Sequence, residues 1–201
     1  MRDALAATPP AEDPAHLVAA DLVAVRSVDP TIRLDIRYAG HDNFLGTPVY
    51  NAPVGMLQRP AAEALARINQ SLRSRGLGLL VHDGYRPWYV TKIFWDATPA
   101  DLRLFVADPA EGSRHNRGGA VDLTLFDLAT GNAVEMPGLY DETSDRSYAA
   151  FVGGSSRQRW YRDLLKTAME AEGYTVYPFE WWHFDYDGWR TFPIQNRFLT
   201  E

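Results

Sequence analysis

Residues 113–125 read SRHNRGGAVDLTL, and the second half of this segment predicts a strand of the central sheet. From 120 to 126 apolar and polar residues alternate, which is the pattern of a half-buried β-strand. Asp122 stands between Val121 and Leu123, so its carboxylate projects from the face opposite their side chains. A carboxylate among apolar neighbours needs a cation or hydrogen bonds, so this strand is a candidate ligand site.

His115 lies in the same segment, seven residues before Asp122. On one straight strand an odd separation points two side chains to opposite faces. Gly118 and Gly119 lie between them and can supply a tight bend. The bend would let the imidazole and the carboxylate converge, and zinc accepts both kinds of ligand.

Outside this segment helices and strands are mixed. Residues 58–75 predict a helix, with Pro60 in its first turn and Gly76 as its C-cap. Further helices are predicted at 90–96, 100–107 and 157–172, and strands at 22–28, 31–38, 77–81, 120–126, 174–177 and 181–186. No regular βαβ rhythm appears, which favours an α+β fold: a small, mainly antiparallel sheet flanked by helices, with the metal site on the sheet.

Composition narrows the function classes. The 201 residues are 46% hydrophobic, and the formal net charge of −6 without a basic run argues against nucleic-acid binding. There is no cysteine, which excludes disulfides and thiolate ligands. No apolar run is long enough to predict a membrane span. We expect a flexible N-terminal tail at 1–16 and a single domain at 17–201. The tail lacks the apolar core of a signal peptide, and it can be a natural tail or the remainder of a processed export signal.

A second segment, EWWH at 180–183, places Glu180 three residues before His183 with two tryptophans between them. If His183 binds a metal, Glu180 can reach the open position where a catalytic zinc holds water. It can then act as general base and later as general acid. Two histidines and one carboxylate also form the facial triad of non-haem Fe(II) oxygenases, but there the first histidine and the acid commonly lie closer together.

Several motifs resemble the zinc-dependent D-alanyl-D-alanine dipeptidases of the VanX type. They occur in the order of that family between about Ile32 and Asp185. The motifs are RYAGHDNFLG from Arg37, DGYRP at 83–87, SRHNRGGAVDLTL, YDETSDRS at 140–147 and EWWHFDY. The resemblance implies the fold shared by D,D-peptidases and hedgehog domains, in one zinc dipeptidase domain at 17–201.

The resemblance also implies roles for individual residues. His115, Asp122 and His183 match the three ligands of one zinc ion. Glu180 matches the catalytic base and acid, and Arg86 matches the arginine that stabilises the tetrahedral oxyanion. The residue-level alternative for Arg86 is an ion pair with an acid such as Asp83, which can equally be the partner that holds Arg86 in place. Three weaker matches concern the substrate: Asp141 for its ammonium group, Tyr38 near the same end and Ser113 for its carboxylate. Their alternatives are a loop acid, a core residue and a turn residue.

The implied activity is hydrolysis of the dipeptide D-Ala-D-Ala, a product of bacterial cell-wall metabolism, with vancomycin resistance as one role of the relatives. Alternatives are a zinc D,D- or L,D-carboxypeptidase or endopeptidase acting on longer peptidoglycan peptides, and a metal-binding module without catalysis. Arg114 departs from the family pattern, because the resistance enzymes carry a serine there; its long side chain can reshape the pocket or bind the substrate carboxylate. The location, cytoplasmic or periplasmic, and the oligomeric state stay open.

Overall fold

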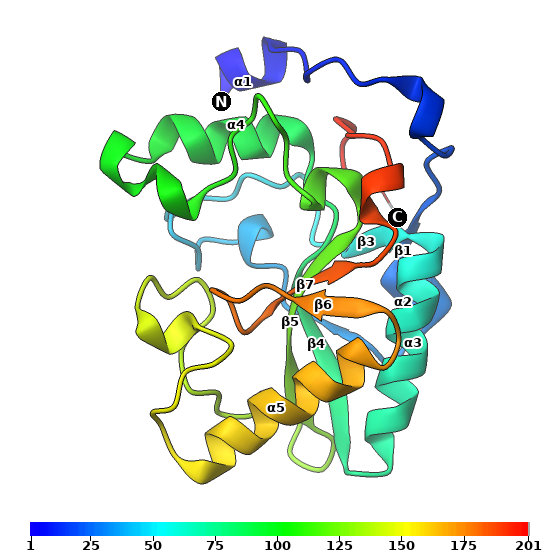
Figure 1. Ribbon diagram of the computed structural model, residues 1–201, viewed down its shortest axis with the longest axis vertical. Helices are drawn as coiled ribbons and strands as arrows, with labels where there is room; N and C mark the ends of the chain where they lie inside the picture. The colour runs from blue at the N-terminus through cyan, green and yellow to red at the C-terminus, as the bar shows by residue number, and fades with distance from the viewer. Residues whose placement is uncertain (201) are drawn as a thin grey trace.

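A twisted sheet runs through the centre of the protein (Figure 1). The computed structural model describes residues 1–200, and the side chains at 104 and 105 lie outside this description. The strands are β1 (Leu22–Ala24), β2 (Arg33–Leu34), β3 (Met56–Gln58), β4 (Leu77–Asp83), β5 (Ala120–Asp127), β6 (Tyr174–Val176) and β7 (His183–Tyr186). Five of them form the central sheet in the order β2-β4-β5-β7-β6, and β1 pairs separately with β3.

Only β2 and β4 pair in parallel within this sheet, and its other neighbouring strands are antiparallel. The sheet is therefore mainly antiparallel, as the sequence predicts. β4 and β5 form its longest ladder, which is interrupted by an irregularity between Val81 and Asp83.

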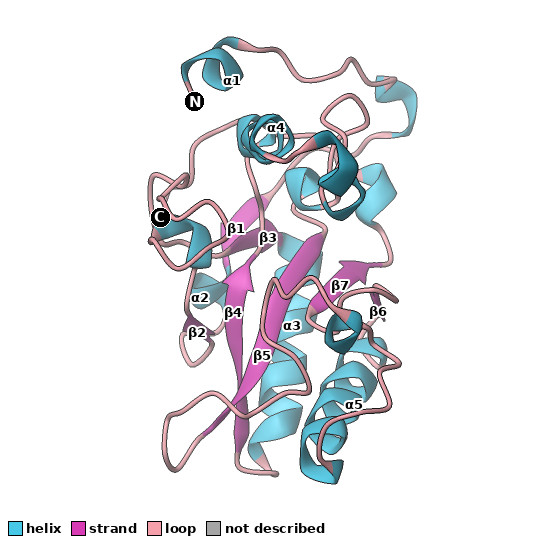
Figure 2. Ribbon diagram, turned by 90° about the vertical axis from the view of Figure 1, so that its left-hand side faces the viewer, coloured by secondary structure: helices cyan, strands magenta, loops and turns pink. Residues whose placement is uncertain are grey.

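Helices cover one face of the sheet and one of its ends (Figure 2). The α-helices are α1 (Arg2–Ala6), α2 (Val25–Val28), α3 (Arg59–Arg73), α4 (Trp88–Ala97) and α5 (Ser156–Glu170). The 3-10 helices are η1 (Pro14–His16), η2 (Arg37–Ala39), η3 (Ala100–Phe105), η4 (His115–Arg117), η5 (Asp145–Ser147) and η6 (Trp189–Thr191). α3 and α5 lie side by side on one face, while α4 and α1 lie beyond one end of β4 and β5 (Figures 1 and 2).

The two long helices begin and end where local signals place them. α3 carries Pro60 in its first turn, and Gly76 follows its end with φ +73°. α5 starts in a capping box in which Ser155 and Gln158 satisfy each other's backbone N–H groups. Both helices bury apolar side chains against the sheet, in a cluster that extends from Leu22 to Leu199.

The strand predicted at 31–38 is wrong over most of its length. Only Arg33–Leu34 pair with β4, and the chain then turns into η2. The N–H of Ala39 donates to the carbonyl of Ile36 instead of joining a ladder. The alternating pattern nevertheless reflects burial, since the turn directs Tyr38 into the interior, where it is 2% exposed.

The N-terminal segment contacts the rest of the protein. Ala4 of α1 is buried, and α1 packs against α4. Further along, the Glu12 carboxylate lies 2.7 Å from Arg117 Nη1 and accepts a hydrogen bond of 2.6 Å from the N–H of Ile194. The flexibility of 1–16 stays a prediction, as does the single domain at 17–201, of which Glu201 lies outside the described residues. Among residues 1–200, no helix has the length and apolar character needed to cross a membrane.

Candidate active site

Three neighbouring strands bring polar side chains into one row across the sheet. Asp83 at the end of β4 is opposite Asp122 on β5, and Asp122 is opposite His183 at the start of β7. Because Val121 and Leu123 belong to the apolar cluster, Asp122 faces the other side of the sheet. The predicted position of the Asp122 carboxylate is therefore confirmed.

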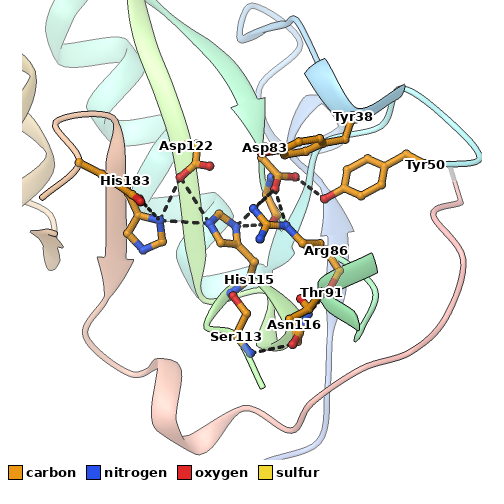
Figure 3. A network of polar contacts seen from close by, with 12 residues as sticks. Tyr38, Tyr50, Asp83, Arg86, Thr91, Ser113, His115, Asn116, Asp122 and His183 are labelled. Carbon is orange, nitrogen blue, oxygen red and sulfur yellow. Dashed lines mark hydrogen bonds and ion pairs between the residues drawn. The ribbon is translucent and has the colours of Figure 1, made fainter. Parts of the chain in front are cut away.

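His115 joins this row from η4, just before β5 (Figure 3). The turn between them depends on two glycines. Gly118 adopts the left-handed conformation, with φ 66° and ψ 20°, and a Cβ added there would lie 2.3 Å from Leu22 Cδ2. A Cβ on Gly119 would lie 2.5 Å from Trp189 Cβ. The glycines therefore make the bend that the sequence predicts and also let the chain pack closely at that bend.

Three ligand atoms converge on one point. His115 Nε2 lies 3.1 Å from His183 Nδ1, and Asp122 Oδ1 lies 3.3 Å from the first nitrogen and 3.0 Å from the second. Two ligands at about 2.0–2.1 Å from a tetrahedral zinc ion are about 3.3 Å apart. The triangle therefore has the size of one face of a zinc tetrahedron, and all three residues are buried.

Hydrogen bonds on the far side of each imidazole fix which nitrogen is free. His115 Nδ1 lies 2.7 Å from the carbonyl oxygen of Gly84, which leaves Nε2 for the metal. His183 Nε2 lies 3.0 Å from Asp185 Oδ1, which leaves Nδ1 for the metal. Such outer partners are typical of histidines that bind metal ions.

The electrostatics of the cluster favour a bound cation. Burial alone would raise the pKa of Asp122, but the charges and hydrogen bonds of His115 and His183 lower that pKa well below its ordinary range. Burial alone would lower the pKa of His183, but hydrogen bonds to Asp122 and Asp185 raise it to about 10. A metal ion that binds here therefore replaces a proton.

Glu180 lies beside the same histidine. Its Oε2 is 3.8 Å from His183 Nδ1, the nitrogen that faces the other ligands. Burial raises the pKa of Glu180, the positive charge of His183 counteracts this, and the negative charge of Asp122 adds to it. A half-buried carboxyl with a raised pKa, next to a metal position, has the properties of a group that exchanges protons with water.

Arg86 is held rigidly at the other side of His115. Its Nε and Nη2 donate to Asp83 Oδ2 at 3.1 and 2.8 Å, and Asp83 also accepts from Tyr50 Oη at 2.6 Å. Within the described residues its third nitrogen, Nη1, makes no hydrogen bond. The ion pair considered from the sequence therefore exists, and it leaves Nη1 of a buried guanidinium available to another group.

Asp141 and Tyr38 form a second acidic position. Tyr38 Oη donates to Asp141 Oδ2 at 2.7 Å. Asp141 has φ +58°, the only left-handed non-glycine residue among those described, which is a strained conformation. Burial raises the pKa of Asp141 to about 7, and the hydrogen bond from Tyr38 offsets part of that effect. A positively charged group bound here would offset the penalty that burial places on the Asp141 carboxylate.

Ser113 has a structural contact. Its Oγ accepts a hydrogen bond of 3.2 Å from the N–H of His115, and its own N–H donates to Asn116 Oδ1 at 2.7 Å. The turn role considered from the sequence is therefore present, and contact with a substrate carboxylate stays a prediction. Asn116 also donates to the carbonyl of Arg86 at 2.8 Å, which ties η4 to the arginine.

Two further residues contact the ligands and were missed from the sequence. Asp185 bonds to His183, and Tyr140 Oη donates to Asp122 Oδ2 at 3.1 Å. Asp185 lies two residues after His183 on a strand, so the period of two was an available signal. Tyr140 comes from a loop, and no periodicity points to it.

A convergent two-histidine, one-carboxylate set beside a proton-exchanging glutamate and a buried guanidinium defines a metal-dependent hydrolase. Comparison with known proteins agrees with this class. Residues 18–199 match the peptidase M15 family, described as D-ala-D-ala dipeptidase, and the chain belongs to this family.

Individual relatives cover most of the chain. It is 32% identical over 174 residues to a D-alanyl-D-alanine dipeptidase of Escherichia coli K12, covering 87% of this chain and 89% of the relative. It is 35% identical over 173 residues to a D-alanyl-D-alanine dipeptidase of Enterococcus faecium, covering 76% and 85%. Among solved structures, the LD-carboxypeptidase LdcB is 19% identical with a TM-score of 0.51, covering 89% of this chain and 72% of LdcB, which supports the fold.

Proposed function

We propose that this protein is a zinc metallopeptidase that hydrolyses the dipeptide D-Ala-D-Ala to two molecules of D-alanine. One zinc ion is held by His115, Asp122 and His183. The observation that carries the proposal is the triangle of ligand atoms, 3.0 to 3.3 Å apart, with the Glu180 carboxylate 3.8 Å from one of them. The choice of D-Ala-D-Ala as the substrate rests on the relatives, which are D-alanyl-D-alanine dipeptidases.

A zinc ion held by these three residues would lower the pKa of a bound water molecule and polarise the scissile carbonyl group. Glu180 accepts a proton from the attacking water and delivers it to the nitrogen of the leaving alanine. The raised pKa of Glu180 suits it to hold the proton between these two transfers. The tryptophans that follow it are each 3% exposed and belong to the apolar cluster, which anchors the segment that carries Glu180.

Arg86 stabilises the negative charge that develops on the carbonyl oxygen. Asp83 fixes two nitrogens of the guanidinium, and Nη1 is the donor left for the oxyanion. The rings of Phe94 and Tyr38, 4.7 and 5.3 Å from the guanidinium carbon, hold its plane in place. The geometry is therefore set before the substrate arrives.

The free amino group of the dipeptide is bound by Asp141. A positive ammonium group removes the penalty that burial imposes on the Asp141 carboxylate, and Tyr38 keeps that carboxylate oriented. An acylated peptide has no ammonium group to offer. This position therefore favours a free dipeptide over a longer wall peptide. A metal-binding module without catalysis would have no use for Glu180 and Arg86 beside the metal.

The test is the variant Glu180→Gln, with Glu170→Gln as control because Glu170 is an exposed acid on α5 that pairs with Lys166. Glu180→Gln should retain zinc but lose about 10²- to 10⁴-fold in kcat, the usual contribution of a general acid–base group. Full activity of Glu180→Gln with zinc bound would reject the mechanism. Rapid cleavage of an acyl-tripeptide ending in D-Ala-D-Ala, without cleavage of the dipeptide, would reject the free dipeptide as the substrate.

A further inference from the structure

Asp185 joins a metal-ligand histidine to an arginine. Its Oδ1 lies 3.0 Å from His183 Nε2, and its Oδ2 lies 2.8 Å from Arg114 Nη1. The side chain of Asp185 is 14% exposed, so both of its oxygens interact largely away from water. Arg114, Asp185 and His183 therefore form a continuous polar chain that ends at the proposed metal position.

The fold places this chain across the two segments that carry the histidines. Arg114 directly precedes His115 at the start of η4, and Asp185 follows His183 by two residues on β7. The ion pair between Arg114 and Asp185 therefore connects η4 to β7 on the outer side of the ligand triangle. If the pair is lost, the segments that carry the two imidazoles lose this side-chain link.

Arg114 itself is held in one orientation. Its guanidinium carbon lies 5.3 Å from the ring centre of Tyr177 and 5.4 Å from that of Trp189. Cation–π contacts with these two rings and the ion pair with Asp185 fix the side chain. Nη1 of Arg114 is directed at the Asp185 carboxylate, so this end of the guanidinium supports the aspartate.

We propose that Asp185 and Arg114 are positioning residues for the metal ligand His183. Asp185 accepts the Nε2–H of His183, which directs Nδ1 at the metal position, and Arg114 holds Asp185 in place. The inference rests on the proposed function, since it takes His183 as a zinc ligand. It also assigns Arg114 a task at the metal rather than at the substrate.

The experiment measures the dissociation constant of zinc by competition with a chromophoric chelator, in the parent and in the variants Asp185→Ala, Asp185→Asn and Arg114→Ser. The matched control is Asp187→Asn, since Asp187 lies just beyond β7 and is exposed. Thermal unfolding of each metal-free variant separates a change in zinc affinity from a change in folding.

Asp185→Ala should bind zinc about 10- to 100-fold more weakly, the usual effect of removing an outer hydrogen-bond partner of a metal ligand. Asp185→Asn should lose less, because its amide oxygen still accepts from His183. Arg114→Ser should weaken zinc binding without raising KM for the dipeptide. Zinc affinity within about twofold of the parent in Asp185→Ala would overturn the proposal, as would an equal loss in the control. If Asp185→Ala does not fold, parent-like affinity in both Asp185→Asn and Arg114→Ser would overturn it instead.

A further variant separates this inference from the proposed function. His183→Ala should lose zinc almost completely. If it binds zinc as the parent does, the ligand set is wrong and the proposed function fails with it. If His183→Ala loses zinc while Asp185→Ala keeps the parent affinity, only the positioning proposal fails. A raised KM in Arg114→Ser with unchanged zinc affinity would place Arg114 at the substrate.

Discussion

Replacing Asp141 by asparagine should make the metal-free protein more stable, and the gain should grow with pH. Burial raises the pKa of the Asp141 carboxyl from its ordinary 3.8 to about 7. Between these values the folded protein keeps the proton and the unfolded chain loses it. The free energy of unfolding therefore falls as pH rises from about 4 to about 7. Asparagine does not titrate, tolerates the left-handed φ and can still accept the hydrogen bond of Tyr38.

The size of this effect follows from the shift. About three pKa units correspond to at most about 4 kcal/mol at pH 8, at 1.36 kcal/mol per unit. Asp141 is partly exposed, and screening by water reduces the value. Between pH 5 and pH 8 the advantage of asparagine should grow by up to about 2.7 kcal/mol, since about two units of the shift lie in that interval.

Urea denaturation of the metal-free protein at pH 5 and pH 8 measures this difference. The exposed Asp187→Asn serves as control and should show no such growth. The same Asp141→Asn variant should raise KM for D-Ala-D-Ala, because it loses the charge that binds the ammonium group. A stability difference that does not change with pH, or an unchanged KM, would refute the assignment of Asp141 as a buried carboxylate that receives a cation.

Three other substitutions test separate parts of the structure. Gly118→Ala should lower the free energy of unfolding more than Gly76→Ala does, as measured by urea denaturation. Both glycines have a positive φ, so alanine at either position adds about 1–2 kcal/mol of strain. Of the two, only Gly118 has another residue within contact distance of the new Cβ. Equal costs would contradict the close packing at the bend. Arg86→Lys should lower kcat about 10²- to 10³-fold at unchanged zinc content, because it loses the fork that Asp83 fixes; an unchanged kcat would remove Arg86 from the mechanism. Tyr140→Phe should weaken zinc binding by about 10-fold in a chelator competition, because it removes the hydrogen bond to Asp122 Oδ2, and parent-like affinity would show that this bond does not orient the ligand.

The sequence predicts most of the sheet and both long helices, because their signals are local. The alternation at 120–126 predicts a strand, Pro60 predicts the start of a helix and Gly76 predicts its end. Each of these signals depends only on residues that are close together in the sequence. The strand predicted at 31–38 is wrong because the length of a paired strand depends on residues that are distant in the sequence. After Leu34 the chain leaves β4, although β4 continues to Asp83, and it turns into η2.

The metal-ligand triangle is predicted for a different reason. The ligands lie in motifs that together resemble one family, and the glycines explain how His115 reaches Asp122. The surrounding contacts are not predictable in this way. Arg114 and Asp185 are ordinary charged residues whose pairing exists only once η4 and β7 are adjacent, and Tyr140 reaches Asp122 from a loop without periodicity.

Whether the protein is a zinc-dependent D,D-dipeptidase is tested most directly by a hydrolysis assay on the four stereoisomers of dialanine, L,L, L,D, D,L and D,D, with the metal content of the same protein measured alongside. We predict that D,D-dialanine is cleaved rapidly and in proportion to bound zinc, up to about one ion per chain, and that chelation abolishes cleavage. Zinc-loaded protein that leaves D,D-dialanine intact, or cleavage that does not depend on bound metal, would contradict it.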